Sequence, residues 1–371
     1  MNWRGMAETL TITVAALVTS LVLFGAFMVA FAHVSLTDLY YYMYLGAFGS
    51  STSWQDTLTR AAPLILTALC TALPARLGLI IIGGEGALVL GGLAAAGTAL
   101  ALHSAPAFVI LPCMMVAGMV VGGLLIAGVG VLRDRRGVNE TISSLLVAYV
   151  AIDVYSYLVE GPMRDPASLN KPSTYPIPAA AVLGNMFGSV HWGLAFGIVF
   201  CIFGFILMRY TTFGFAVRMV GGNVRAAQGA GLPVGRLIFI TCLLGGAAAG
   251  LAGAVEISAI QMQANAALMA AGYGFAGILV SFIARHNPLA IIPAAILFGG
   301  LNAASGILQR RLEVPDASVK VLMGIIFVTI LLFETLYGRM KVFQISTAAA
   351  AAATPPPPPA PPHVVAEPVT V

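Results

Sequence analysis

Long apolar runs separated by short polar segments dominate the chain. Ten such runs are rich in Leu, Ile, Val, Ala and Gly, and each is near the roughly 20 residues that a helix needs to cross the hydrocarbon core of a membrane. They cover residues 10–32, 61–82, 84–102, 107–132, 141–159, 192–208, 237–257, 268–284, 289–308 and 319–337. The pattern predicts an all-α, polytopic transmembrane helical bundle of about ten spans, with its weakest boundary between the second and third runs.

Two features of this pattern have alternative interpretations. Ala30-Phe31-Ala32 resembles a signal-peptidase site, but the first run exceeds the usual hydrophobic region of about 7–15 residues, which favours an uncleaved span. Ten spans also divide into five plus five with opposite orientations, as an inverted repeat requires. Because no clear internal identity accompanies that division, the inverted repeat stays a hypothesis.

Composition agrees with a membrane protein and argues against a soluble one. Of the 371 residues, 59% are hydrophobic and only 9% are charged, whereas a soluble domain carries about 25% charged residues. The basic residues lie at the edges of the apolar runs rather than in one patch, so no nucleic-acid partner is expected. The four cysteines lie inside apolar runs without metal-ligand spacing, so we expect small membrane-embedded hydrophobes.

The distribution of Arg and Lys orients the bundle. With both termini inside, the inner segments collect twelve basic residues and the outer segments six, which satisfies the positive-inside rule. We therefore expect both termini in the cytoplasm, the loop 211–236 in the cytoplasm and the Pro-rich loop 160–191 outside. Residues 1–346 form the predicted transmembrane domain, and the Ala/Pro-rich residues 347–371 are expected to be a disordered cytoplasmic tail.

The loop 211–236 is the longest basic segment between two strongly apolar runs, and it contains no acidic residue. Asn223 is a suitable N-cap for a short helix, Gly231 suits a left-handed closing residue, and Pro233 prevents continuation. A helix of about two turns is not stable alone. It therefore has to be held by the flanking spans or by a docked partner. The alternative is a charged loop that only fixes the topology.

No catalytic or metal-binding set stands out. The chain lacks a phosphate-binding GxxxxGK[ST] segment, and its histidines lie at the edges of spans or in the tail. Glycines cluster at 83–97 and 245–253, which indicates close helix packing, with helix breaks near a substrate path as the alternative.

Charged and polar residues inside apolar runs are the better candidates for function, because they usually face a cavity or a partner. Tyr149, Asp153 and Tyr157 follow at four-residue steps, so they share one helix face. That face is interpreted either as pore lining or as a set of hydrogen bonds between helices. A candidate substrate path comprises Glu85, Asn139, Glu140, Tyr149, Asp153, Glu256 and Gln261.

Three stretches resemble a known family. They are GLIIIGGEGALVLGGLAAA (78–96), GVNETISSLLVAYVAIDVYSYLVEGPMRDP (137–166) and TTFGFAVRMVGGNVRAAQGAGLPVGR (211–236). The chain resembles the permease subunits of bacterial ABC importers for simple sugars and nucleosides, most of all the nucleoside, basic-membrane-protein-linked branch. The resemblance extends over about residues 10–340.

The resemblance implies that the loop 211–236 is a coupling segment that docks on a separate ABC ATPase subunit. Its candidate contacts are Asn223, Arg225, Ala226, Ala227, Ala230 and Gly231. The further expected partners are a second permease chain, which would make a heterodimer, and an external substrate-binding lipoprotein or periplasmic protein. The expected location is the lipid bilayer of the bacterial inner membrane. The chain itself would hold no cofactor and catalyse nothing, because ATP and Mg would bind in the ATPase.

Departures from the family pattern qualify what is expected. Ile81 and Ala87 stand where the family often has Asn and Gln, so the substrate among nucleosides, purine-like compounds and simple sugars stays open. Val224 and Arg225 replace a typical Pro-Glu, which predicts an ATPase with a more acidic groove. The competing hypotheses are an ion-coupled secondary transporter of a small polar solute, using Asp153 or Glu256, and an integral membrane enzyme.

Overall fold

The computed structural model describes residues 3–335. They divide into two compact units, the first containing residues 3–22 and 325–335 and the second containing residues 23–324. The predicted tail, 347–371, lies outside the described residues. In the first unit, the start of α1 (Trp3–Ala32) and the end of α14 (Ala317–Glu334) bury Ile12, Ala16 and Ile330.

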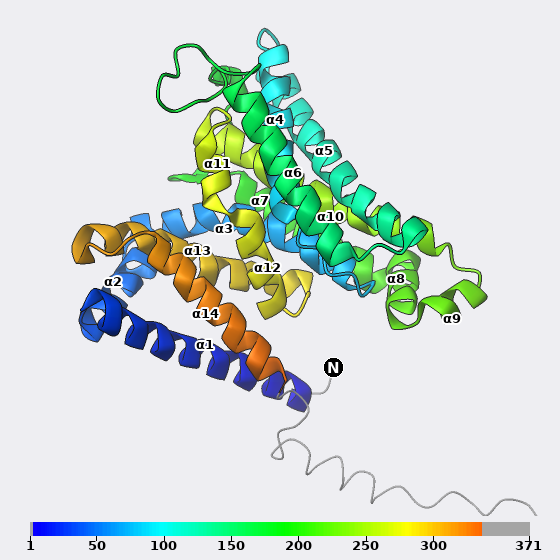
Figure 1. The fold of residues 1–371 in the computed structure, drawn as a ribbon, viewed down its shortest axis with the longest axis horizontal. Helices are drawn as coiled ribbons and strands as arrows, with labels where there is room; N and C mark the ends of the chain where they lie inside the picture. Colours follow the sequence, from blue (N-terminus) through cyan, green and yellow to red (C-terminus); the bar gives the residue numbers. More distant parts are fainter. Residues whose placement is uncertain (1–2, 336–371) are drawn as a thin grey trace, which may run out of the picture. The chain divides into compact units, whose positions relative to one another are not determined.

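The second unit is helical apart from one short hairpin, as Figure 1 shows. Its further helices are α2 (Leu36–Phe48), α3 (Ser51–Ala75), α4 (Gly84–Ala101), α5 (Ala107–Arg136), α6 (Glu140–Glu160), α7 (Gly193–Tyr210), α8 (Thr212–Gly222), α9 (Val224–Gly229), α10 (Val234–Glu256), α11 (Ala266–Ala271), α12 (Tyr273–Ile283) and α13 (Pro288–Leu312). A 3₁₀ turn η1 (Ala179–Ala181), a π-helical turn η2 (Ile257–Gln261) and strands β1 (Asn185–Phe187) and β2 (Val190–His191), which pair antiparallel, complete it.

The helices confirm the predicted all-α polytopic bundle. Within the described residues, nine helical segments are long and apolar enough to cross a membrane, and Ala317–Phe333 of α14 is a shorter apolar helix. Every one of the ten predicted apolar runs therefore contains a helix. The segments around α3 and α10 are the most buried of the nine, so these two helices form the centre of the second unit.

Glycines set how closely α10 packs on its neighbours. A Cβ at Gly250 of α10 would overlap the carbonyl oxygen of Gly118 and lie 3.1 Å from Cα of Gly122, both on α5. A Cβ at Gly91 of α4 would lie 2.5 Å from Cα of Gly250. Because backbones meet here without side chains between them, the glycine clusters serve helix packing, the first of the two interpretations made from the sequence.

Two boundaries differ from the sequence prediction. The segment 33–59 lies between the first two predicted apolar runs, yet it is largely helical: it forms α2 and the first turns of α3, where the Ser50 hydroxyl accepts the Ser53 N–H at 3.1 Å. The second predicted span runs to residue 82, but α3 ends at Ala75. Gly78 then adopts a left-handed φ of 78°, which only glycine reaches without strain, and turns the chain out of the helix.

The chain after Gly78 is extended, and its backbone N–H and C=O groups form hydrogen bonds with side chains rather than within a helix. The Thr71 hydroxyl donates to the Ile81 carbonyl at 3.0 Å, and the Ile82 N–H donates to the Ser144 hydroxyl at 3.0 Å. Buried backbone groups need such partners. This linker therefore delivers the chain to the first turn of α4, where Glu85 lies.

Candidate functional site

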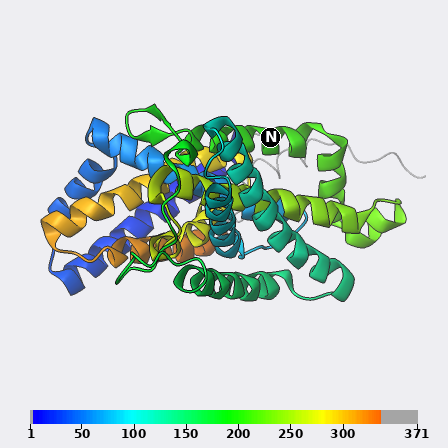
Figure 2. The same ribbon diagram turned by 90° about the horizontal axis from the view of Figure 1, so that it is seen from above.

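The loop 211–236 folds into two short helices, α8 and α9, which lie toward one end of the second unit in both views (Figures 1 and 2). The Thr211 hydroxyl accepts the Gly214 N–H at 3.1 Å at the start of α8. The Asn223 side-chain oxygen accepts the Ala226 N–H at 3.1 Å at the start of α9. Gly231 closes α9 with a φ of 78°. The predicted short helix and both of its boundary residues are confirmed, whereas α8 was not predicted.

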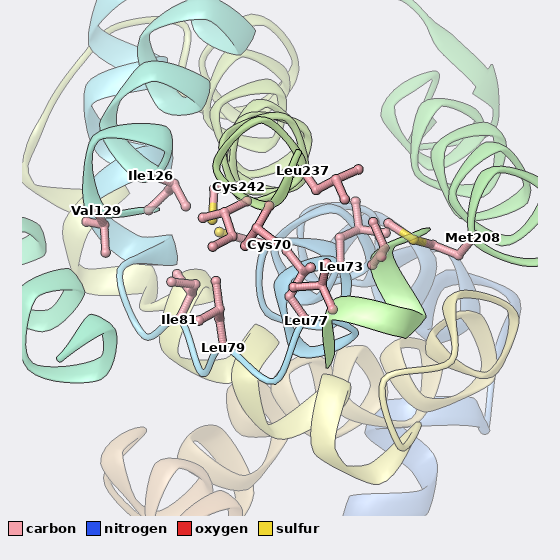
Figure 3. Packing of buried hydrophobic residues seen from close by; sticks show 14 of the residues in the cluster. Cys70, Leu73, Leu77, Leu79, Ile81, Ile126, Val129, Met208, Leu237 and Cys242 are labelled. Carbon is pink, nitrogen blue, oxygen red and sulfur yellow. The ribbon is translucent and has the colours of Figure 1, made fainter. Parts of the chain in front are cut away.

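The apolar faces of α8 and α9 belong to the core of the second unit. Val217 and Val220 of α8 and Ala227 of α9 are in one buried cluster with residues of α3, α5, α7 and α10, part of which Figure 3 shows. The cluster also contains Leu73, Leu77, Met208 and Leu237. The flanking spans therefore hold α9, which is the first of the two alternatives that its shortness left open.

The opposite face of α9 is exposed. Of the six candidate coupling residues, Ala227 is fully buried, while Asn223, Arg225, Ala226, Ala230 and Gly231 are exposed. Ala227 thus positions α9 from inside the chain, and the other five form a surface on which a partner can lie. Arg225 carries the charge of this five-residue surface, which is therefore basic.

Arg76, just after α3, joins three segments at the base of this loop. Its Nη2 donates to the His286 carbonyl in the α12–α13 turn at 2.8 Å, and its own carbonyl is so close to Gly221 of α8 that a Cβ there would overlap it. Arg285 and His286 both have positive φ, 49° and 54°, and the His286 Nδ1 lies 2.9 Å from the Ser281 hydroxyl. Burial, and secondarily the nearby Arg218, lower the pKa of Arg76.

This junction was missed at the level of the sequence, where Arg76 counted only toward topology. Its partner is a backbone carbonyl about 210 positions away, for which no residue pattern gives a signal. Through the contacts of Arg76, α8, the end of α3 and the α12–α13 turn therefore meet at one residue.

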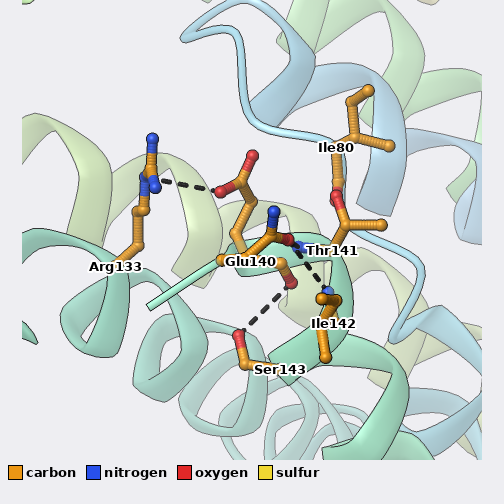
Figure 4. Close-up of polar contacts among 7 residues, drawn as sticks. Ile80, Arg133, Glu140, Thr141, Ile142 and Ser143 are labelled. Carbon is orange, nitrogen blue, oxygen red and sulfur yellow. Dashed lines mark hydrogen bonds and ion pairs between the residues drawn. The ribbon is translucent and has the colours of Figure 1, made fainter. Parts of the chain in front are cut away.

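Asn139 and Glu140 have structural partners at the start of α6 (Figure 4). The Asn139 side-chain oxygen accepts the N–H groups of Thr141 and Ile142 at 2.9 and 3.1 Å, so it is an N-cap. Glu140 lies 3.3 Å from Nε of Arg133, at the end of α5. These contacts account for both residues and fix the turn between α5 and α6.

Glu85 and Glu256 are buried in the bundle. The Glu85 Oε2 accepts the Gly274 N–H at 2.6 Å, which ties the first turn of α4 to that of α12, whereas its Oε1 has no hydrogen-bond partner among the described residues. Glu256 ends α10 and is hydrogen-bonded by the Gln261 side chain from the π-helical turn η2. Glu85 therefore joins the ends of two helices, and Glu256 bonds the end of α10 to the turn that follows it.

Tyr149, Asp153 and Tyr157 are on an exposed face of α6 instead. The tyrosines are 53% and 71% exposed, and Asp153 is exposed between them. An ionised carboxylate facing lipid near the centre of a span costs about 2.5–3.5 kcal/mol on an insertion scale. This face is thus poorly suited to contact with lipid.

The loop 160–191 is tied to the segment after α10. The N–H groups of Thr174, Ile177 and Leu183 donate to the carbonyls of Ala264, Met262 and Ser258 at 2.8–2.9 Å. The Tyr155 hydroxyl of α6 donates to the Asn265 carbonyl in the same segment at 2.8 Å. An open hollow of about 540 Å³ lies on this loop, lined by Asp165, Ser168, Lys171 and Gln263 among others.

The structure does not gather the seven predicted path residues into one pocket. Asn139 and Glu140 lie at the start of α6, Glu85 at the start of α4, and Glu256 and Gln261 at the end of α10. Only Tyr149 and Asp153 share a face that is open to the surroundings. Their role on a substrate path stays a prediction, and α6 is where the geometry supports it best.

Comparison with known proteins places these features in a family. Residues 53–331 match the family model described as the branched-chain amino acid transport system / permease component. The chain is 33% identical to a glucose ABC transporter permease protein of Haloferax volcanii, over 86% of this chain and 87% of the relative. Two guanosine ABC transporter permease proteins of Bacillus subtilis are 29% and 27% identical, over 81% and 76% of this chain and 87% and 91% of their own lengths.

Proposed function

Because the chain belongs to the branched-chain amino acid transport system permease family, as a multi-pass membrane subunit of an ABC importer, we propose that it carries a nucleoside or a simple sugar across the bacterial inner membrane. The two-to-one excess of basic residues on one side supports the proposal that both termini and the loop 211–236 lie in the cytoplasm. Solute delivered by an external binding protein, either a lipoprotein or a periplasmic protein, passes through the membrane as a separate ATPase hydrolyses ATP.

One observation carries the coupling part of this proposal. The loop 211–236 is anchored in the core by Val217, Val220 and Ala227, yet it exposes a basic face around Arg225. An anchored helix moves with the spans when its exposed face is pushed, whereas a free loop would absorb the push. ATP and Mg bind in the ATPase on this scheme, and the chain itself has a mechanical role.

A second permease chain completes the pathway. The two similar guanosine permease proteins of B. subtilis are distinct chains of the same organism. This supports a heterodimer here, in which the present chain pairs with a related but different permease.

The coupling assignment can be tested by photocrosslinking in the complete importer. A benzophenone amino acid at Arg225 should crosslink to the ATPase. The same group at Phe108, which is 79% exposed at the start of α5 on the predicted outer side, should not. Arg225→Glu should weaken the ATP hydrolysis that the loaded binding protein stimulates, while membrane insertion is unchanged. Crosslinks from position 225 that never reach the ATPase would refute the assignment.

The energy source distinguishes this function from an ion-coupled transporter. Uptake into proteoliposomes should depend on enclosed ATP and continue after an ionophore has collapsed the ion gradients. Uptake that stops with the gradient, with ATP still present, would favour the secondary transporter. Binding of candidate nucleosides and sugars to the external receptor would then identify the solute.

A further inference from the structure

Asp153 is a charged side chain exposed inside a membrane span. It lies seven residues before the end of α6, Glu160, which puts it about 10 Å along the helix from that end at the helical rise of 1.5 Å per residue. No hydrogen bond or ion pair joins it to any other residue in the described range 3–335. Glu85 and Glu256, by contrast, are buried and hydrogen-bonded.

The orientation of α6 is fixed by its opposite face. Ala148 packs so closely on Gly86 of α4 that a Cβ at Gly86 would lie 2.7 Å from its Cα. Tyr155 is fully buried, and its hydroxyl is bonded to the Asn265 carbonyl. Rotating α6 to hide Asp153 would break both contacts, so its carboxylate is held outward.

Two aromatic residues flank the carboxylate on the exposed face. Tyr149 and Tyr157 lie one helical turn before and after Asp153, about 6 Å away along the axis in each direction. They are 53% and 71% exposed. A carboxylate between two such rings offers strong hydrogen-bond acceptors beside apolar surfaces, and a carboxylate accepts hydrogen bonds from two neighbouring hydroxyl groups at once.

We propose that the Tyr149–Asp153–Tyr157 face of α6 lines the water-filled translocation path and binds the vicinal hydroxyl groups of an uncharged solute, such as a hexose or the ribose of a nucleoside. The inference rests on the proposed function. The Asp153 carboxylate accepts two hydroxyl protons in hydrogen bonds, and the tyrosine rings contact the apolar face of the sugar ring or the base. Its negative charge repels phosphorylated solutes, so nucleotides and sugar phosphates are not carried.

The test removes the solute hydroxyl groups and the Asp153 carboxylate separately and together, as in a double-mutant cycle. The complete importer, with its receptor and ATPase, is reconstituted with wild-type chain, Asp153→Asn or the matched control Glu160→Gln, an exposed acid at the end of the same helix. Initial ATP-dependent uptake is measured for guanosine and 2′,3′-dideoxyguanosine, and for glucose and 2-deoxyglucose. Because the same receptor serves all three proteins, its own preference cancels when ratios are compared between variants.

For whichever solute pair the wild-type importer carries, the preference for the hydroxylated member should fall about tenfold in Asp153→Asn, as expected for the loss of hydrogen bonds to a charged acceptor. It should be unchanged in Glu160→Gln. An equal ratio in wild type and Asp153→Asn overturns the inference. So does loss of the second permease from purified Asp153→Asn complexes, since Asp153 would then be a subunit contact. If the wild-type importer shows no ATP-dependent uptake of these solutes or of any nucleoside or simple sugar that its receptor binds, the proposed function fails first.

Discussion

Gly250 is the point at which α10 meets both α4 and α5 without intervening side chains. Replacing it with alanine adds one methyl group, which would overlap the Gly118 carbonyl oxygen and lie 2.8 Å from its carbon. Ordinary van der Waals contact begins near 3.4 Å. The neighbour is backbone rather than the flexible end of a side chain, so the two helices have to separate.

The magnitude follows from two opposing terms. Overpacking of this kind costs about 1–3 kcal/mol. Gly128, on the same helix as Gly118, provides a matched control because a Cβ there meets no atom within 4 Å. Alanine at that position removes a flexible helical glycine and should stabilise the chain by about 0.5–1 kcal/mol. Gly250 is also a helical glycine, so the same gain applies to Gly250→Ala and cancels in the comparison. We therefore expect Gly250→Ala to be less stable than Gly128→Ala by about 1–3 kcal/mol.

The assay is thermal unfolding in detergent, followed by the fraction of chain that still elutes as a monodisperse peak after heating. At about 2–4 °C for each kcal/mol, a difference of about 1–3 kcal/mol should separate the two midpoints by roughly 2–12 °C. Equal midpoints for Gly250→Ala and Gly128→Ala would show that the close crossing of α5 and α10 is wrong. A lower midpoint for Gly128→Ala alone would contradict the open space assigned to that position.

Three further outcomes are expected. Asn223→Ala removes the cap of α9, should destabilise that helix by about 1 kcal/mol, and should lower receptor-stimulated ATP hydrolysis in the complete importer more than basal hydrolysis. Burial, and then the Arg76 charge, lower the pKa of His286 in the folded chain. On acidification the unfolded chain therefore binds a proton first, and the stability of the folded chain should fall as pH drops through about 6.5. Unfolding midpoints at pH 7.5 and 5.5 should show a smaller loss in His286→Gln than in the wild type. Glu140→Gln breaks the pair with Arg133, in which the arginine side chain is 43% exposed and the glutamate side chain 12%. Because the guanidinium stays solvated, the unfolding free energy should fall by no more than about 1 kcal/mol, and a larger loss would mean that burial of the carboxylate decides the strength of the pair.

The features that could be predicted from the sequence are those decided by interactions between residues close together in the chain. Apolar runs of membrane length became helices, and α9 starts and ends at the residues whose side chain and backbone suit those positions, Asn223 and Gly231. That the flanking spans or a partner had to hold α9 followed from its shortness, and the structure shows its buried face packed in the core of the chain. These features depend on residues a few positions apart, which a single sequence displays directly.

What could not be predicted depends on contacts between distant segments. The early end of α3 reflects Gly78 together with hydroxyl groups from α3 and α6 that hold the linker in extended form. The Arg76–His286 contact likewise joins segments far apart in the chain. Among the path candidates, Asn139 and Tyr149 look equally polar in the sequence, yet one caps a helix and the other lies on an open face.

The helix α10 begins just after α9 and ends at the turn that receives the backbone of the loop 160–191. It is packed on α5 at glycine contacts that leave little room for bending. A tilt imposed at Val234 is therefore transmitted along α10 to the segment that follows it, where the carbonyls of Ser258, Met262 and Ala264 accept three hydrogen bonds from the loop 160–191. On the proposed topology, this helix and the turn at its end couple the release of a solute by its receptor to ATP hydrolysis in the ATPase without a diffusing signal.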